Sequence, residues 1–139
     1  MVYIDFAKCF DTVDTKILLA KLESKGVIGA ALQWIKSFLV NRTFRVRVEG
    51  EFSDEAPVIS GIPQGTCLGP LLMLIMNSDI DDAIKHASVG AFADDVKLTM
   101  RSRSNADCDL LMEDLKNVEA WASKNNMRIN NEKLVAVRY

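Results

Sequence analysis

The sequence has few of the residues that build thiolate, imidazole or disulfide sites. Its 139 residues include 3 cysteines and 1 histidine, and no two cysteines form a CxxC pair. Zinc modules and disulfide scaffolds are therefore disfavoured, and free thiols in a reducing compartment are expected. A Ser-His-Asp or Cys-His centre could use only His86, and no GxSxG nucleophile elbow accompanies it. Any chemistry must depend on carboxylates, lysine or backbone groups.

Long apolar runs are also missing. The longest unbroken apolar stretch is Leu71–Met76, whereas a membrane span needs roughly 20 such residues. No charged segment precedes an apolar run at the start, so no signal peptide is expected. The sequence therefore predicts an intracellular protein, in the nucleus, the cytoplasm or both, with no membrane partner.

The composition is that of one globular domain, which we place over residues 1–139. Hydrophobic residues make up 49% and charged residues 26%, and 17 basic against 19 acidic residues give a net charge of -2. A polybasic tail is excluded, but local nucleic-acid contact is not, since net charge does not locate the charges. Strand-like apolar residues lie at both ends, which predicts a fragment of a longer protein.

The periodicity along the chain predicts an α+β fold. Helices are expected at 14–25, 29–41 and 66–84, and from a Ser104 cap to about residue 125. Strands are expected at the start, at 44–49 before a turn at Gly50, twice within 89–100 around a turn at 94–95, and near 127–129 and 134–139. Because hairpins occur among the helices, we expect an antiparallel or mixed sheet with helices packed on one face.

Three aspartates are candidates for metal binding. Asp94 and Asp95 lie between two apolar strands, where a turn could present both carboxylates, and such close like charges favour a cation between them. An ordinary solvated turn is the alternative, and for this pair alone the more frequent case. Asp5 ends an apolar strand, where a carboxylate needs a partner. Three such carboxylates could hold two Mg²⁺ ions for phosphoryl or nucleotidyl transfer, and a two-metal nuclease would also satisfy them.

A glycine- and proline-rich loop, Ser60–Pro70, leads into an apolar helix. Its glycines let the backbone approach a flat ligand, and amides at a helix start can meet phosphate. The alternative is a helix start built from turn residues. The loop matches neither the P-loop nor the dinucleotide-binding fingerprint.

Together these segments resemble a known family. The stretches DFAKCFD (5–11), SGIPQGTCLGPLL (60–72) and FADD (92–95), followed by MRINNEK (127–133), resemble motifs A to D of reverse transcriptases. The variant is that of non-LTR, LINE-like, jockey-type retrotransposons. The resemblance implies a polymerase palm with part of the fingers. It also implies RNA-directed DNA synthesis from dNTPs on a primed RNA or DNA template, with two Mg²⁺ ions or Mn²⁺ as a substitute.

The resemblance also assigns site residues. Asp5, Asp94 and Asp95 would bind metal, with the backbone carbonyl of Phe6. The remaining assignments are a steric gate under the incoming sugar at Phe10, a nucleotide pocket at Gln64 and Gly65, and a general acid for pyrophosphate at Lys133. The match at Asp11 is interpreted as structural, because of its position at a helix start. Cys9, Thr15 and Leu134 depart from the family pattern without removing a catalytic carboxylate.

Two further expectations concern partners and activity. Strand alternation would place Arg45 and Arg47 on one polar face, where they could contact template phosphates or simply face solvent. The resemblance implies that upstream fingers, a downstream thumb and an endonuclease belong to a longer polyprotein. We therefore expect the isolated chain to be inactive. The alternative function is an inactive remnant that binds nucleic acid weakly.

Overall fold

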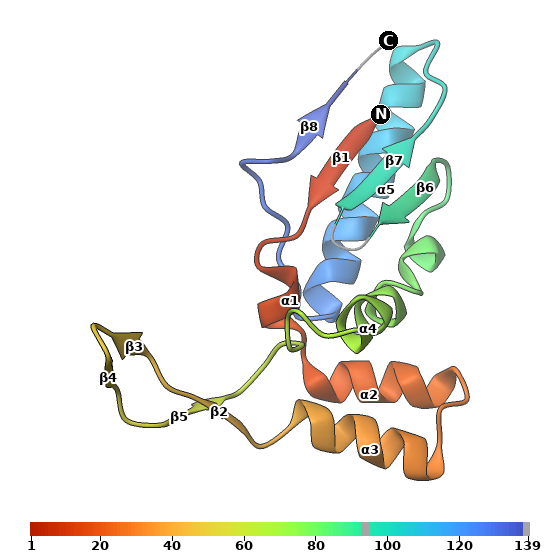
Figure 1. Cartoon of the computed structure of the whole chain (residues 1–139). Coiled ribbons are helices and arrows are strands. Elements are labelled where there is room, and N and C mark those ends of the chain that lie inside the picture. The colour runs from red at the N-terminus through yellow and green to blue at the C-terminus, as the bar shows by residue number, and fades with distance from the viewer. Residues whose placement is uncertain (93–94, 138–139) are drawn as a thin grey trace.

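The chain has the predicted α+β fold, in which the longest helix runs along one face of an antiparallel sheet and most of the other helices lie beyond one end of the sheet (Figure 1). The computed structural model describes residues 1–92 and 95–137. The helices are α1 (Cys9–Thr12), α2 (Thr15–Ser24), α3 (Gly29–Leu39), α4 (Leu68–Met76), the 3₁₀ helix η1 (Ile80–Ala83) and α5 (Asn105–Lys124). The strands are β1 (Val2–Asp5), β2 (Arg42–Phe44), β3 (Arg47–Val48), β4 (Glu51–Phe52), β5 (Ala56–Val58), β6 (Ser88–Phe92), β7 (Asp95–Thr99) and β8 (Val135–Ala136).

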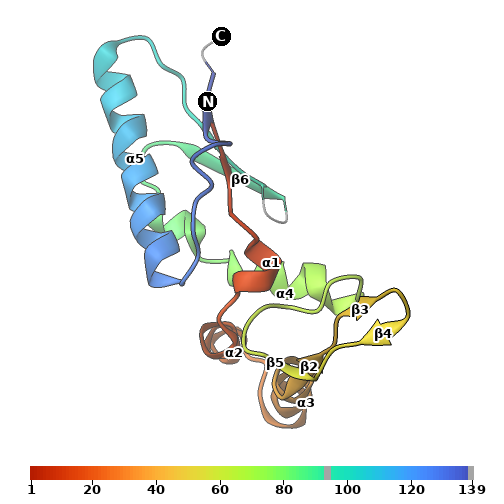
Figure 2. The same ribbon diagram turned by 90° about the vertical axis from the view of Figure 1, so that its left-hand side faces the viewer.

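The main sheet has the strand order β6-β7-β1-β8, and every neighbouring pair is antiparallel. Figure 2 shows α5 along one side of this sheet. Alternate residues of the two central strands, Val2, Ile4, Val96 and Leu98, are buried on that side. Tyr3, between two of them, is 40% exposed. The sheet therefore has one face in the core and one face open to solvent, as expected for an antiparallel sheet.

The longest helix begins with the predicted cap. Ser104 Oγ accepts a hydrogen bond from the Asp107 backbone N–H, and the Asp107 carboxylate accepts one from the Ser104 N–H. This reciprocal capping box satisfies two donors that the first helical turn leaves unpaired. Asp14 caps α2 in a similar way by accepting hydrogen bonds from two backbone N–H groups. The helices predicted at 14–25, at 29–41 and to about residue 125 are confirmed.

The helix predicted at 66–84 was too long. The chain leaves the α-helical conformation after Met76 and continues through a turn into η1. The turn residues Asn77, Ser78 and Asp79 have short polar side chains that compete for backbone hydrogen bonds and so favour helix ends. Apolar periodicity persists across this turn, because both segments face the same core.

The strand predicted at 44–49 is also interrupted. Residues 42–44 pair with 56–58, and residues 47–48 pair with 51–52. Residues 45–46 lie between these pairings on one side, and residues 53–55 on the other. The return segment therefore has one extra residue, which is the arrangement of a β-bulge. The expected turn at Gly50 is present, with φ +97°.

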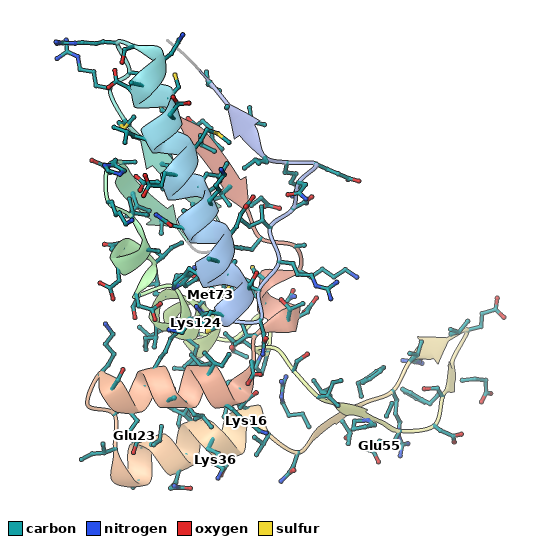
Figure 3. The ribbon with its side chains drawn as sticks, turned by 180° about the vertical axis from the view of Figure 1, so that it is seen from behind. Lys16, Glu23, Lys36, Glu55, Met73 and Lys124 are labelled. Carbon is teal, nitrogen blue, oxygen red and sulfur yellow. The ribbon has the colours of Figure 1, made fainter. Side chains whose placement is uncertain are left out.

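This hairpin forms an arm that extends away from the rest of the molecule (Figure 1). Glu55 lies on the arm, well separated from Lys16 and Lys36 on the two helices at the base (Figure 3). Four large apolar side chains of the arm are more than half exposed: Phe44, Val46, Val48 and Phe52.

No helix of residues 1–92 and 95–137 has the length and hydropathy of a membrane span.

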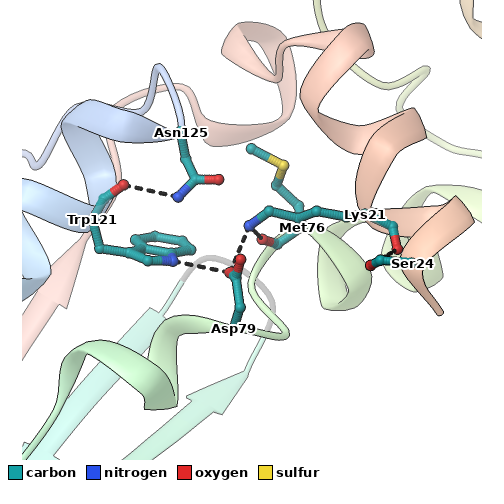
Figure 4. A network of polar contacts seen from close by, with 6 residues as sticks. All are labelled: Lys21, Ser24, Met76, Asp79, Trp121 and Asn125. Atoms are coloured by element: carbon teal, nitrogen blue, oxygen red, sulfur yellow. Dashed lines mark hydrogen bonds and ion pairs between the residues drawn. The ribbon is translucent and has the colours of Figure 1, made fainter.

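A partly buried ionic contact joins α2 to the turn between α4 and η1 (Figure 4). Lys21 Nζ lies 2.6 Å from Asp79 Oδ1 and donates to the Met76 carbonyl at 2.7 Å. The same carboxylate oxygen accepts a hydrogen bond from Trp121 Nε1 at 2.9 Å. Burial alone would raise the pKa of Asp79. The hydrogen bonds from Lys21 and Trp121 lower it by more, so the pKa lies below its ordinary value. Three elements, α2, the end of α4 and α5, therefore meet at one carboxylate.

A second carboxylate, Asp114 on α5, is fully buried. It accepts hydrogen bonds from three consecutive backbone N–H groups, those of residues 85–87, at 2.7–2.9 Å. Burial raises the pKa of Asp114, and the three backbone hydrogen bonds more than reverse this, so the pKa lies below its ordinary value of 3.8. Asp114 therefore fixes the loop before β6 to α5.

Replacing Asp114 tests this attachment. Asp114→Asn places an amide nitrogen against backbone donors and should lower the free energy of unfolding by about 2–3 kcal/mol at pH 7. Because the folded pKa is depressed, the stabilisation is present above pH 3.8 and is lost as the pH falls towards the folded pKa. The deficit of the variant should therefore shrink in acid. Urea unfolding at several pH values measures this loss of stability. Asp109→Asn, at an exposed position of the same helix, is the matched control. Equal stability of the two variants would contradict the role of Asp114.

Candidate active site

Two of the predicted aspartates face each other across the central strands. Asp5 ends β1 and Asp95 begins β7, and they are direct partners in the antiparallel register. Each lies one residue beyond a buried neighbour, Ile4 and Val96, so both side chains are on the open face of the sheet. Direct partners have Cβ atoms about 5 Å apart. Asp95 was expected at the tip of a turn, whereas it is the first residue of a strand; Asp94 lies outside the described residues.

The Asp5 carboxylate is held by the segment after α5. Asn130 Nδ2 donates to Asp5 Oδ2 at 3.2 Å, and the Asn130 backbone N–H donates to the Asp5 carbonyl at 2.8 Å. Lys133 Nζ lies 3.3 Å from the same carboxylate. The Asp5 side chain is 16% exposed and that of Lys133 is 66% exposed. A largely covered carboxylate is thus neutralised from the solvent side by a lysine.

The chain reverses just after β1 and forms the short helix α1. Lys8 adopts φ +49°, and the Ala7 N–H donates to the Arg128 carbonyl at 2.8 Å. The side chain of Phe6 points into the core, with its ring centroid 5.9 Å from that of Trp121. Phe10 follows one turn later and is half-buried. The tight reversal therefore places Phe10 beside the end of the strand that carries Asp5.

The predicted glycine-rich loop packs against the carbonyl end of α1. Ile62 N–H donates to the Phe10 carbonyl at 2.7 Å, Gly61 N–H to the Val13 carbonyl at 2.9 Å, and Ser60 Oγ to the Asp11 carbonyl at 2.8 Å. Gly61 has φ +89°, and a Cβ there would lie 2.8 Å from both the Phe10 and Asp11 carbonyl oxygens. Only glycine fits this contact without displacing the backbone.

The loop then turns into α4 through Thr66. Thr66 Oγ1 donates to the Pro63 carbonyl at 2.9 Å and accepts from the Gly69 N–H at 3.2 Å. Just before it, Gln64 extends back across α1, and its Nε2 donates to Asp11 Oδ1 at 2.9 Å. The loop is thus fixed at both ends, and one exposed amide projects between them.

A cleft of about 660 Å³ gathers these parts. Its lining includes Asp5, Phe10, Gln64 and Lys133, together with Asn130. An adjoining hollow of about 280 Å³ is lined by Phe10, Gln64 and Gly65. The structure therefore brings together candidates from three segments that are distant in the sequence.

Other predicted residues lie outside this cleft. Asp95 lines a separate hollow on the open face, with Tyr3 and Lys97. Arg45 and Arg47 are on the arm, where Arg45 lies 3.8 Å from Glu55 and Arg47 stacks over the Phe52 ring at 5.3 Å. The bulge separates these arginines from any single alternating strand, so the expected common polar face has no basis in the strand pairing.

Two contacts of the site were missed by the sequence interpretation. The sequence indicated Asn130 only as one residue of the 127–133 motif. An Asn-Asn pair before Glu132 is nevertheless typical of a turn in which an asparagine side chain forms a hydrogen bond with nearby backbone. The Asp11–Gln64 hydrogen bond joins residues 53 positions apart, and no local pattern indicates it. Of the described residues, no three His, Cys, Asp or Glu side chains are grouped as a metal site, and Asp94 is outside that set.

The fold defines the class of protein. The telomerase of Candida albicans, solved with the TWJ fragment of telomeric RNA, superposes with a TM-score of 0.74 at 14% identity, over 99% of this chain and 27% of the telomerase chain. The apo telomerase of Candida tropicalis gives 0.71 at 16% identity, over 98% of this chain and 30% of the other. With the antiparallel sheet and its facing aspartates, this is a polymerase palm fold.

The sequence comparisons identify the family. The model for reverse transcriptase (RNA-dependent DNA polymerase) matches residues 1–138. The RNA-directed DNA polymerase from mobile element jockey of Drosophila melanogaster is 34% identical over 99% of this chain, and the probable polymerase from transposon X-element is 34% identical over 94%. This chain belongs to the reverse transcriptase family, as the motifs predicted. It spans 16% of the jockey protein and 15% of the X-element protein.

The contact of Gly61 with α1 can be tested by adding one methyl group. Gly61→Ala should cost roughly 3–5 kcal/mol, because the left-handed backbone and the clash with two carbonyls add together. Gly26→Ala is the matched control: its φ is +87° and nothing lies within 4 Å of the added Cβ. It should cost only about 1–2 kcal/mol. Urea unfolding compares the two, and equal losses would show that the loop can shift away from α1 freely.

Proposed function

We propose that this chain is the palm core of an RNA-directed DNA polymerase that transfers nucleotides from dNTPs to a primer 3′-hydroxyl on an RNA or DNA template. The observation that carries the proposal is the cleft itself. It combines a restrained carboxylate at Asp5, an exposed cation at Lys133, an aromatic ring at Phe10 and an amide at Gln64. These are the positions at which the family motifs lie. The names of the relatives, all insect mobile elements, support retrotransposition as the setting.

The longer protein is part of the proposal. Since this chain spans about a sixth of the jockey polymerase, we propose that a fingers segment, a thumb and an endonuclease belong to the same polyprotein. Catalysis of nucleotidyl transfer depends mainly on positioning and electrostatics. The palm would supply the carboxylates and the sugar contact, while the other parts would hold the duplex and the triphosphate.

The residues of the open face suit a hard divalent cation. Asp5 and Asp95 oppose each other directly, and like charges in that arrangement repel. Lys133 Nζ already lies 3.3 Å from the Asp5 carboxylate, which supports the proposal that this largely covered carboxylate takes a cationic partner. Asp5, Asp94 and Asp95, with the Phe6 carbonyl, would hold two Mg²⁺ ions, or Mn²⁺. When bound, these ions would stabilise the attacking and leaving oxygens.

The other residues of the cleft have distinct proposed roles. Lys133 Nζ would donate a proton to the leaving pyrophosphate. The Phe10 ring would lie under the incoming sugar and exclude a 2′-hydroxyl. Gln64 and Gly65 would contact the nucleotide. Asn130 would hold Asp5 through two hydrogen bonds, which keeps the carboxylate oriented while Lys133 moves to the phosphate.

The arm is the proposed template contact, although the alternation argument for it fails. Arg45 and Arg47 are exposed and lie beside exposed apolar side chains, a combination that can bind phosphate and stack on bases. An inactive remnant is the alternative function. It would retain nucleic-acid binding by the arm without synthesis.

The decisive test is primer extension by a complete reverse transcriptase that contains this chain. Asp5→Asn and, separately, Asp94→Asn should each lower kcat/KM by more than about 100-fold, because each removes a charge from the catalytic centre. The fold of the Asp5→Asn variant should be retained, since the Asp5 side chain is not part of the hydrophobic core. Asp109→Asn on the exposed side of α5 is the control. Full synthesis by either variant would overturn the two-metal proposal, and no synthesis by the unmodified protein would favour the remnant.

Sugar selection gives a second prediction. Phe10→Ala in the complete enzyme should raise rNTP incorporation relative to dNTP, because the ring no longer blocks a 2′-hydroxyl. Fit in an apolar pocket is typically worth about 10–200-fold in discrimination, and a rigid clash can exceed this. The measurement is the rNTP-to-dNTP ratio of kcat/KM. If Phe10 only packs against the core, both substrates should lose equally and the ratio should stay constant.

A further inference from the structure

The packing of the loop against α1 does not require the hydrogen bond between the Asp11 carboxylate and the Gln64 amide. The loop is already fixed to α1 by hydrogen bonds from Ser60, Gly61 and Ile62 to backbone carbonyls. None of these involves the Asp11 side chain. Both Asp11 and Gln64 are exposed, and a hydrogen bond between exposed groups adds little to stability. The stability of the loop therefore does not depend on the Asp11 carboxylate.

An amide has one end that donates and one that accepts, whereas a carboxylate only accepts. Asp11 Oδ1 receives Gln64 Nε2 at 2.9 Å. The reversed amide would bring Gln64 Oε1 against a negatively charged oxygen. Asp11 therefore selects one of the two orientations of the Gln64 amide, and the carbonyl Oε1 is directed away from Asp11.

The position of Gln64 indicates why one orientation of its amide would matter. Gln64 lines both the cleft that contains Asp5 and the adjoining hollow, and Phe10 lines both with it. Asp11 itself lines neither. An oriented carbonyl beside the proposed sugar contact can accept a hydrogen bond from a hydroxyl or amino group of a bound nucleotide.

We infer that Asp11 is a positioning residue that acts through Gln64, orienting its amide so that Oε1 accepts a hydrogen bond from the incoming nucleotide. The inference rests on the proposed function and assigns to Asp11 a part in nucleotide binding in place of the purely structural role predicted from its helix position. A fixed amide loses no rotational freedom when the nucleotide arrives, so Asp11 increases affinity without contacting the nucleotide.

The kinetic test uses the complete reverse transcriptase. Asp11→Ala should raise the KM for dNTP about 3- to 10-fold, the cost of ordering the freed Gln64 side chain on binding, with kcat changed less than about twofold. In a Gln64→Ala background the same substitution should change KM by less than about twofold, because the amide is already absent. Independent, multiplied losses in the double variant would overturn the inference. So would a fall in kcat with KM unchanged.

A spectroscopic test on the 139-residue chain separates this inference from the proposed function. The side-chain N–H₂ signals of Gln64 in a ¹⁵N-correlated NMR spectrum should move to the positions of a free glutamine in Asp11→Ala. The backbone signals of residues 60–62 should stay in place, and Asp109→Ala should move none of them. Unchanged Gln64 signals would refute the orienting contact, whatever the activity. If these signals move but Asp5→Asn leaves synthesis intact, the proposed function fails while the contact stands.

Asp11→Asn provides a second variant where the alanine variant does not fold. It keeps the size of the side chain and one acceptor oxygen, but its own amide can also donate to Gln64 Oε1. Both orientations of Gln64 then become available, and KM should rise about twofold. An unchanged KM in a folded Asp11→Asn protein, together with unmoved Gln64 signals, would count against selection by the carboxylate.

Discussion

The antiparallel pairing of β1 with β7 is the constraint on which the rest of the structure depends. In this register Val2 and Ile4 are buried on the side of α5, and Asp5 faces Asp95 on the other side. A slip by one residue would move the apolar side chains to solvent and the aspartate into the core. The energy that fixes the register is therefore apolar burial on one face. The chemistry on the open face is positioned by residues that never contact it.

A second constraint is the set of hydrogen bonds from residues 60–62 to backbone carbonyls of α1 and Val13, which fixes the glycine-rich loop beside the cleft. Three donors of the 60–62 segment reach carbonyls of α1 and the residue after it, and Gly61 fits because it has no Cβ. Side-chain changes elsewhere in the loop leave these bonds intact. This explains how Phe10 and Gln64, on separate segments, stay beside one another while both remain partly accessible.

The sequence predicted those parts of the fold whose cause is local. Caps at Asp14 and Ser104 and the apolar, strand-like residues of β1 specify their elements within a few residues, so these predictions hold. The bulge in the arm depends on its pairing partners, which periodicity does not encode. The break after Met76 lies at three short polar residues, 77–79, but the apolar periodicity on both sides of them conceals it. For the site, motif order identified Asp5, Phe10, Gln64 and Lys133 as neighbours. It did not indicate that Asn130 holds Asp5 or that Asp11 holds Gln64, because both contacts span more than 50 residues.

The opposed aspartates carry a cost that the surrounding residues offset. Like charges directly across a strand pair are destabilising by roughly 0.2–1 kcal/mol, and Asp5 is also largely covered. Asn130 Nδ2 offsets this cost with one hydrogen bond to the Asp5 carboxylate, and Lys133 with a positive charge. The two residues that contact the Asp5 carboxylate, Asn130 and Lys133, differ in their exposure to solvent. Asn130 is half-buried and tied to the backbone of Asp5, so it stays in place. Lys133 is 66% exposed on a long side chain. On the proposed function, a metal ion would replace the lysine as the positive charge beside Asp5, while the Asn130 hydrogen bond would keep the carboxylate in place.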